Sequence, residues 1–149
     1  MPPPLRHKLS GVHFLAADAH LTPVPFDQQV ESLSAILLDQ DYYDFLHAHT
    51  RHRAGVRVVT EPALIGLKAR AWLDLTARKS ANPDAVDSRH IGKHRSDVLR
   101  LSQLLSPDDR IEVAEAIRAD VARFCRQVAP DVSPQLLDQL EIAESPDAL

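Results

Sequence analysis

The 149-residue sequence is poor in the residues on which small secreted or membrane-embedded domains depend. Its single cysteine, Cys125, has no partner for an intramolecular disulfide, which excludes a disulfide-stabilised fold and fits a reducing cytoplasm. Cys125 falls on an apolar helical stripe and is expected to be a buried thiol. No run of about 18 apolar residues is present, and the start Met1-Pro-Pro-Pro is not that of a signal peptide. We therefore expect a cytoplasmic protein without a membrane segment.

Strong charge of one sign is also missing. The formal net charge is -4 at pH 7, so the chain has no overall basic character and bulk attraction to nucleic acid is not indicated. A site for a polyanion would have to be local. The basic start of one predicted helix, with Arg89, Lys93, Arg95 and Arg100, offers such a patch, but no known nucleic-acid-binding signature accompanies it. Nucleic acid is therefore expected only as an acceptor substrate.

What is present is enough apolar sequence for one folded unit. Hydrophobic residues make up 44% of the chain, ample for a core at this length. We predict a single domain over 1–149, of the α+β class and mostly α. A partial sheet and a short helix should occupy 1–59 and pack on a helical bundle over 60–142, followed by a frayed tail at 143–149.

Capping residues and apolar periodicity predict four helices in the bundle. Thr60 with Pro62 begins the first, and Asp87 or Ser88 begins the second. The run Ser106-Pro107-Asp108-Asp109 combines a cap, a first-position proline and acidic residues, and so predicts the start of the third. The predicted helices span 61–79, 88–105, 107–129 and 134–142.

The first 60 residues are less regular. The short apolar run 12–17 is compatible with a strand, and the apolar run 26–38 fits strand or helix, with helix slightly favoured. A short helix with an aromatic side is predicted over 39–48, and a strand over 56–59. Between them His47, His49 and His52 form a His-x-His-x-x-His loop. No cysteine or carboxylate completes a metal site there, which favours a solvated basic loop over metal binding.

Two charged residues stand out on the first two bundle helices because they do not lie on the solvated side. At about 100° per residue, Lys68 projects from the middle of the apolar arc of its helix, and Asp97 projects at the border of the core, near the buried stripe that contains His94. Lys68 and Asp97 are therefore expected to contact each other. Such a pair is either a structural link between packed helices or a cation held at a cleft for an anionic ligand.

At these residues the chain resembles a known family. The strings LK-x-x-A-W-L-D-L-x-x-R-K and K-H-x-x-D-V-x-R-L, together with the preceding LTPVPFDQQVESLSAILLDQDYYDFL, are similar to the C-terminal half of bacterial nucleotidyltransferase-fold proteins of the AbiEii/AbiGii toxin kind. The similarity spans about residues 21–105. In that family the lysine and aspartate that correspond to Lys68 and Asp97 are associated with the nucleotide site.

One part of the family's pattern is missing. Such enzymes begin with a strand-turn-helix that carries Gly-Ser and a pair of acidic residues, which hold Mg²⁺ on the triphosphate. This sequence has no Gly-Ser pair among its four glycines and no motif-like acidic cluster before residue 60, so no residue is assigned to a metal. We expect the catalytic N-terminal half to be absent, and Mg²⁺ with nucleoside triphosphate to be a cofactor only if that half is supplied.

The resemblance implies a nucleotidyltransferase-like protein that helps to bind nucleoside triphosphate and acceptor but is inactive as this chain alone. Lys68 would bind the triphosphate, Asp97 would be the catalytic residue that orients Lys68 or a metal-bound water, and Arg78, Lys93 and Arg95 would hold nucleotide or acceptor. The alternative is a non-catalytic protein-protein interaction module derived from the family. An antitoxin or other second chain, or a second copy of this chain, would then be the partner, with nucleotide bound weakly.

Overall fold

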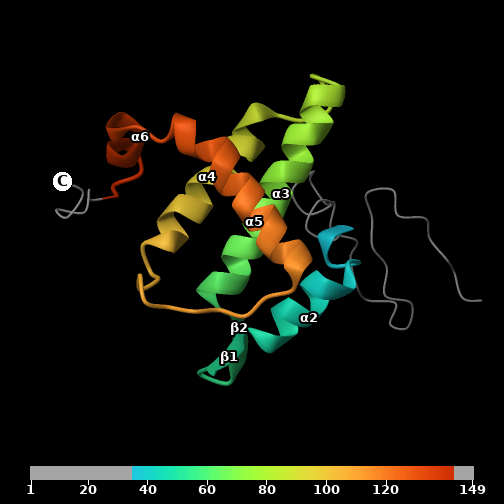
Figure 1. Cartoon of the computed structure of the whole chain (residues 1–149), viewed down its shortest axis with the longest axis vertical. Helices are drawn as coiled ribbons and strands as arrows, with labels where there is room; N and C mark the ends of the chain where they lie inside the picture. The colour runs from blue at the N-terminus through green and yellow to red at the C-terminus, as the bar shows by residue number, and fades with distance from the viewer. Residues whose placement is uncertain (1–34, 143–149) are drawn as a thin grey trace, which may run out of the picture.

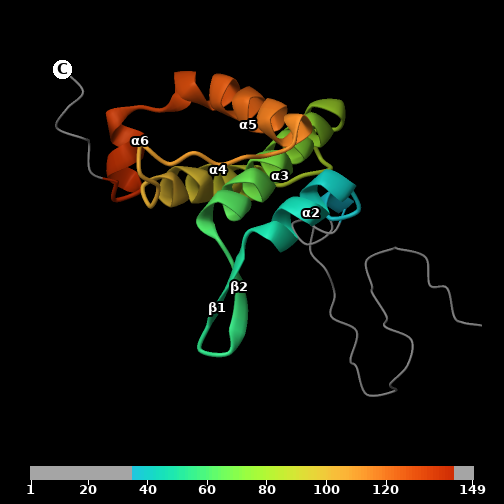
Figure 2. The same cartoon turned by 60° about the horizontal axis from the view of Figure 1, so that its bottom comes forward.

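The computed structural model of the protein describes residues 35–142, and within them the fold is α+β and mostly α, as predicted (Figure 1). The long helix α3 runs through the middle, with α4 and α5 packed along it and α2 at one end (Figures 1 and 2). The elements, in chain order, are α2 (Gln40–Ala48), β1 (Thr50–Arg53), β2 (Val56–Val59), α3 (Glu61–Ala81), α4 (Ser88–Ser102), α5 (Glu115–Val128), the 3-10 turn η1 (Ala129–Asp131) and α6 (Pro134–Gln139).

Helix α2 forms the first half of the core with α3. The carboxylate of Asp39 accepts hydrogen bonds from the first amides of α2, which fixes its start where the sequence predicted a cap. Tyr42 and Phe45 are buried, and they pack in a cluster with Leu67 and Ile117. Gly66 permits this approach, because a Cβ there would lie 3.0 Å from the Phe45 ring. The aromatic side of α2 is therefore a packing face, as expected.

A hairpin of β1 and β2 replaces the predicted basic loop. The strands are antiparallel, with Arg51 opposite Val58 and Arg53 opposite Val56. The turn between them is Ala54-Gly55, where both residues have positive φ (50° and 77°), as a two-residue hairpin turn requires. The prediction of a loop was wrong here because pairing with β2, rather than the local sequence, makes these residues a strand. The hairpin extends away from the helices and is largely exposed (Figure 2).

Helices α3 and α4 form the second half of the core. The Asp87 side chain caps α4, accepting from the amide of Arg89, as one of the two predicted caps. Thr60 occupies the cap position of α3 but makes no capping bond with its side chain. Trp72 lies edge-on to Phe124 of α5, with ring centroids 5.3 Å apart, and Val98 of α4 packs in the same cluster. Both helices lie within a few residues of their predicted bounds.

The third bundle helix begins later than predicted. Helix α5 starts at Glu115 rather than at 107, because the capping signal at Ser106 closes only one turn. The carboxylate of Asp109 accepts from the Ser106 amide at 2.8 Å, and the Ser106 hydroxyl accepts from the Asp108 amide. The chain then crosses the bundle without regular structure, and Val113 packs against the core cluster of α2 and α3. Val113 is the one half-buried residue of 106–114, and its packing on the core outweighs the local helix signal.

The C-terminal part differs from the predictions in two further details. Cys125 is exposed, not buried, because the inward face of α5 turns through Ile117, Phe124 and Val128 and leaves Cys125 at its edge. Helix α6 ends at Gln139, before the predicted 142, and Glu141 follows with φ 57°, which breaks the helix.

Three predictions lie outside the described residues: the strand at 12–17, most of the run 26–38 and the frayed tail at 143–149. Within residues 35–142, no helix combines the length and the apolar character needed to cross a membrane.

Candidate functional site

Lys68 and Asp97 meet across the contact between α3 and α4. The ammonium of Lys68 donates a hydrogen bond of 2.7 Å to Oδ2 of Asp97, which confirms the predicted contact. The side chains are 22% and 24% exposed, so both charges are partly withdrawn from water but can still be reached. Partial burial strengthens an ion pair relative to bulk water, and it also strengthens the attraction of Lys68 for an incoming anion.

His94 lies beside this pair and is completely buried, as its place on the apolar stripe predicted. Burial first, and then the positive charge of Lys68, lower the pKa of His94 to about 4, while the negative charge of Asp97 opposes the shift. The imidazole is therefore neutral at pH 7 and does not compete with Lys68 for the carboxylate. Among the described residues, neither ring nitrogen has a hydrogen-bond partner. Such unpaired buried groups are uncommon in folded proteins.

The other predicted nucleotide-binding residues are not drawn into the Lys68–Asp97 contact. Arg78 pairs with Asp74 one turn earlier on α3, at 3.0 Å, and is 43% exposed. Lys93 is exposed on α4.

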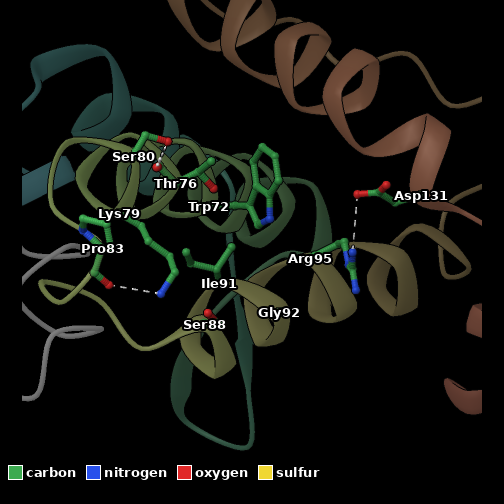
Figure 3. A pocket seen from close by; sticks show the side chains of 10 residues that line it. All are labelled: Trp72, Thr76, Lys79, Ser80, Pro83, Ser88, Ile91, Gly92, Arg95 and Asp131. Carbon is green, nitrogen blue, oxygen red and sulfur yellow. Dashed lines mark hydrogen bonds and ion pairs between the residues drawn. The ribbon is translucent and has the colours of Figure 1, made fainter.

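Arg95 reaches a different side of α4, because side chains two residues apart on a helix point about 200° apart. It lies 3.7 Å from Asp131 at one end of a groove between α3 and α4, which neither Lys68 nor Asp97 lines (Figure 3). Of the five predicted site residues, the structure thus brings Lys68 and Asp97 together and gives Arg78 and Arg95 separate partners.

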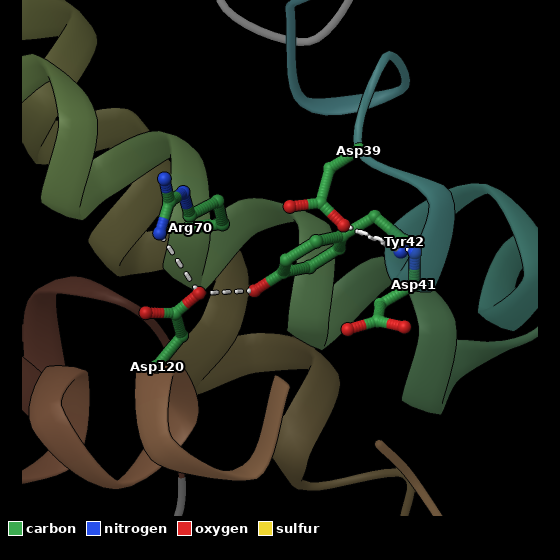
Figure 4. A network of polar contacts seen from close by, with 5 residues as sticks. All are labelled: Asp39, Asp41, Tyr42, Arg70 and Asp120. Atoms are coloured by element: carbon green, nitrogen blue, oxygen red, sulfur yellow. Dashed lines mark hydrogen bonds and ion pairs between the residues drawn. The ribbon is translucent and has the colours of Figure 1, made fainter. Parts of the chain in front are cut away.

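A second polar network, not predicted from the sequence, joins α2, α3 and α5 (Figure 4). Asp120 is only 6% exposed, and its Oδ2 accepts both from the hydroxyl of Tyr42 at 2.9 Å and from the guanidinium of Arg70 at 3.0 Å. Burial and the bond to Asp120 raise the pKa of Tyr42, so the phenol stays protonated and donates. The signal was available: Asp120 lies on the apolar stripe of α5, three residues after Ile117 and four before Phe124.

The histidines of the former loop do not converge. His49 contacts the carbonyl of Phe45 at 3.0 Å, His47 stacks on Tyr43, and His52 is exposed on β1. Within residues 35–142 no three histidine, cysteine or acidic side chains come together as metal ligands would. The described residues thus do not fit the Mg²⁺ site that the family resemblance implies, and no metal-dependent step is derived from them.

Comparison of the chain with protein-family models, with curated proteins and with solved structures finds no match.

Proposed function

We propose that this chain is the nucleotide-binding helical part of a nucleotidyltransferase-like protein of the AbiEii kind, and that it binds the phosphates of a nucleoside triphosphate at Lys68. The observation that carries the proposal is the partly buried Lys68–Asp97 ion pair beside a neutral His94, whose ring has no hydrogen-bond partner within residues 35–142. A lysine that serves only to cover apolar surface extends its ammonium into water, whereas this ammonium is held back by a carboxylate.

Each residue then has a distinct part. Lys68 supplies a point charge that stabilises negative charge on the phosphate oxygens. Asp97 holds the ammonium in place and acts through it as a positioning residue. His94, being neutral, adds no second cation and keeps the pair's inner side closed to water. The triphosphate would arrive with Mg²⁺, whose protein ligands the described part of the chain does not provide. Binding without transfer is therefore the expected behaviour.

The test is calorimetric titration of the purified chain with Mg²⁺ complexes of the four ribonucleoside triphosphates. Weak binding is expected, because one partly exposed cation competes with hydration and salt. Lys68→Met should weaken binding by about tenfold or more, equivalent to about 1.4 kcal/mol. Arg123→Met, which removes one exposed positive charge from α5, is the matched control and should leave affinity unchanged.

An equal loss of triphosphate affinity in both variants would show that binding depends only on net charge. It would contradict a binding site at Lys68. Incorporation of labelled nucleotide into RNA or protein by this chain alone, abolished by Asp97→Ala, would contradict the expected lack of transfer.

The alternative proposal, a protein-protein interaction module, is favoured by apolar surface next to and on α2. Leu38 is 78% exposed and Tyr43 is 45% exposed, although both lie on or beside the helix that forms the core with Tyr42. A second chain, such as an antitoxin or a second copy, would cover them. Light scattering of the purified chain tests the second-copy form: a dimer that Tyr43→Glu dissociates supports it, and a monomer in both proteins contradicts it.

A further inference from the structure

A groove of about 500 Å³ runs between the C-terminal half of α3 and the N-terminal half of α4 (Figure 3). Its α4 wall consists of Ser88, Ile91, Gly92 and Arg95, whose spacing of three, four and seven residues places them on one face of the helix. Asp97, two residues after Arg95, points to another face. The groove therefore shares no residue with the Lys68–Asp97 pair, and a ligand here goes beyond the proposed function.

The middle of the groove is apolar and open. Trp72 of α3 and Ile91 of α4 line it, and Gly92, next to Ile91, contributes no side chain. A Cβ built on Gly92 would meet no described atom within 4 Å, so the space over the glycine is free. Glycine inside a helix costs about 0.5 to 1 kcal/mol relative to alanine, and packing does not require one at this position. The space beside α4 is open because residue 92 is a glycine.

Two cations flank this apolar middle. Lys79 donates to the carbonyl oxygens of Val86 at 2.8 Å and Pro83 at 3.3 Å, which accept two of its three N–H groups, and it forms no ion pair within residues 35–142. Among the described residues, the charged partner of Arg95 is the carboxylate of Asp131, at 3.7 Å, beyond hydrogen-bond distance. Asp131 is 62% exposed and can turn into solvent. The Arg95 end of the groove thus presents a planar donor group that is held loosely.

Polar atoms without partners gather at the same place. Within the described part of the chain, the hydroxyl of Thr76 and Nε of Arg95 are buried and make no hydrogen bond, and both residues line the groove. Unpaired buried donors cost about 1 to 3 kcal/mol each, and a small adjustment of either side chain on ligand binding would relieve that cost. These two atoms are a second observation, independent of the cavity, that points to a ligand.

We propose that this groove binds a small organic phosphomonoester, with the phosphate at the guanidinium of Arg95 and a flat apolar group over Gly92, between Trp72 and Lys79. Guanidinium matches phosphate oxygens with two parallel hydrogen bonds, which makes Arg95 the anchor rather than Lys79. The volume lies within the roughly 300 to 1,000 Å³ of small-molecule sites and suits a ligand of the size of a nucleoside monophosphate.

The experiment titrates the purified chain with adenosine monophosphate, adenosine and inorganic phosphate, and follows binding by calorimetry. The monophosphate should bind at least tenfold more tightly than adenosine or phosphate alone, since each of these contacts only part of the groove. Equal affinity of all three compounds would overturn the proposal.

Four variants locate the binding. Gly92→Leu fills the free space and should abolish binding of the monophosphate, whereas Gly92→Ala adds one methyl group and should retain it. Both should melt at or above the temperature of the natural protein, which shows that loss of binding is not loss of fold. Arg95→Gln should weaken binding about tenfold or more. Asp131→Asn removes the competing carboxylate and should tighten binding several-fold.

Unchanged binding in Gly92→Leu, or weaker binding in Asp131→Asn, would contradict the assignment. Lys68→Met should leave binding of the monophosphate unchanged, so failure here is distinguishable from failure of the triphosphate site.

Discussion

Two of the ion pairs in the described part of the chain tie α3 to other helices, and they differ in how completely their surroundings are hydrogen-bonded. Arg70 reaches Asp120 on α5, where Tyr42 donates to the same carboxylate oxygen. Lys68 reaches Asp97 on α4, next to His94, whose ring nitrogens are unpaired among the described residues. We call the first network closed, because its two donors share one buried acceptor, and the second open, because the buried ring of His94 has no hydrogen-bond partner within residues 35–142. An ion pair between helices is thus not informative by itself, but its surroundings are.

The largest expected effect is a dependence of the unfolding free energy on pH, which His94 gives to the open network. The folded-state pKa of His94 is about 4, below its ordinary value of 6.5, so the unfolded chain takes up a proton first as pH falls. The neutral imidazole makes its full contribution to the unfolding free energy above pH 6.5. As the pH falls from 6.5 to 4, this free energy decreases by about 3 kcal/mol. Urea unfolding from pH 7.5 to 4 in the natural protein and in His94→Leu measures it.

The difference in unfolding free energy between these two proteins should change with pH by about 3 kcal/mol. A constant difference would show that His94 has the same pKa in the folded and unfolded chains. It would then not be a buried, neutral histidine beside Lys68 and Asp97.

Removal of the shared acceptor tests the closed network. Asp120→Ala leaves the buried hydroxyl of Tyr42 without a partner and releases Arg70, which is 42% exposed and can be solvated again. We expect a loss of about 2 to 3 kcal/mol in the free energy of unfolding, measured by urea titration at pH 7. Asp120→Asn, which keeps an acceptor oxygen, should lose less. A change below about 0.5 kcal/mol for the alanine variant would remove the structural role.

Removal of one donor should have a smaller effect. Tyr42→Phe deletes only the hydroxyl and leaves Arg70 on Asp120, so a loss of about 1 kcal/mol is expected in the same titration. Near-additive losses in the double variant Tyr42→Phe/Asp120→Ala would show that the two residues do not act together.

The smallest effect on stability is expected at the open pair. Lys68→Met/Asp97→Leu replaces two partly exposed charges by apolar groups of similar length, so unfolding free energy should change by less than about 1 kcal/mol. Triphosphate affinity should nevertheless fall by tenfold or more in calorimetry. Large destabilisation with unchanged affinity would identify the pair as a structural link, the second interpretation that the sequence allowed.

The sequence was sufficient where local chemistry decides the structure. The caps at Asp39 and Asp87 and the apolar arcs of α3 and α4 are local features, and they led to the Lys68–Asp97 contact because a charged residue inside an apolar arc needs a partner. The two residues are 29 positions apart, yet both were identified from their own helices.

The sequence was insufficient where distant segments decide. Strand β1 exists because it pairs with β2, and the segment from Ser106 to α5 is not helical because Val113 packs on a core built by α2 and α3. The place of Asp120 on an apolar stripe was a local signal, but nothing local identifies its partners, Tyr42 and Arg70, which are 78 and 50 residues away. The groove at Gly92 depends on how two helices cross, which periodicity does not specify.

The most direct test of the central claim is a chemical-shift titration of the isotope-labelled chain with the Mg²⁺ complex of a nucleoside triphosphate. The open pair should respond to the ligand and the closed network should not. We predict that the side-chain resonances of Lys68, Asp97 and His94 move with ligand concentration while those of Tyr42 and Asp120 stay in place. Shifts confined to other parts of the chain, or equal shifts in both networks, would contradict the account.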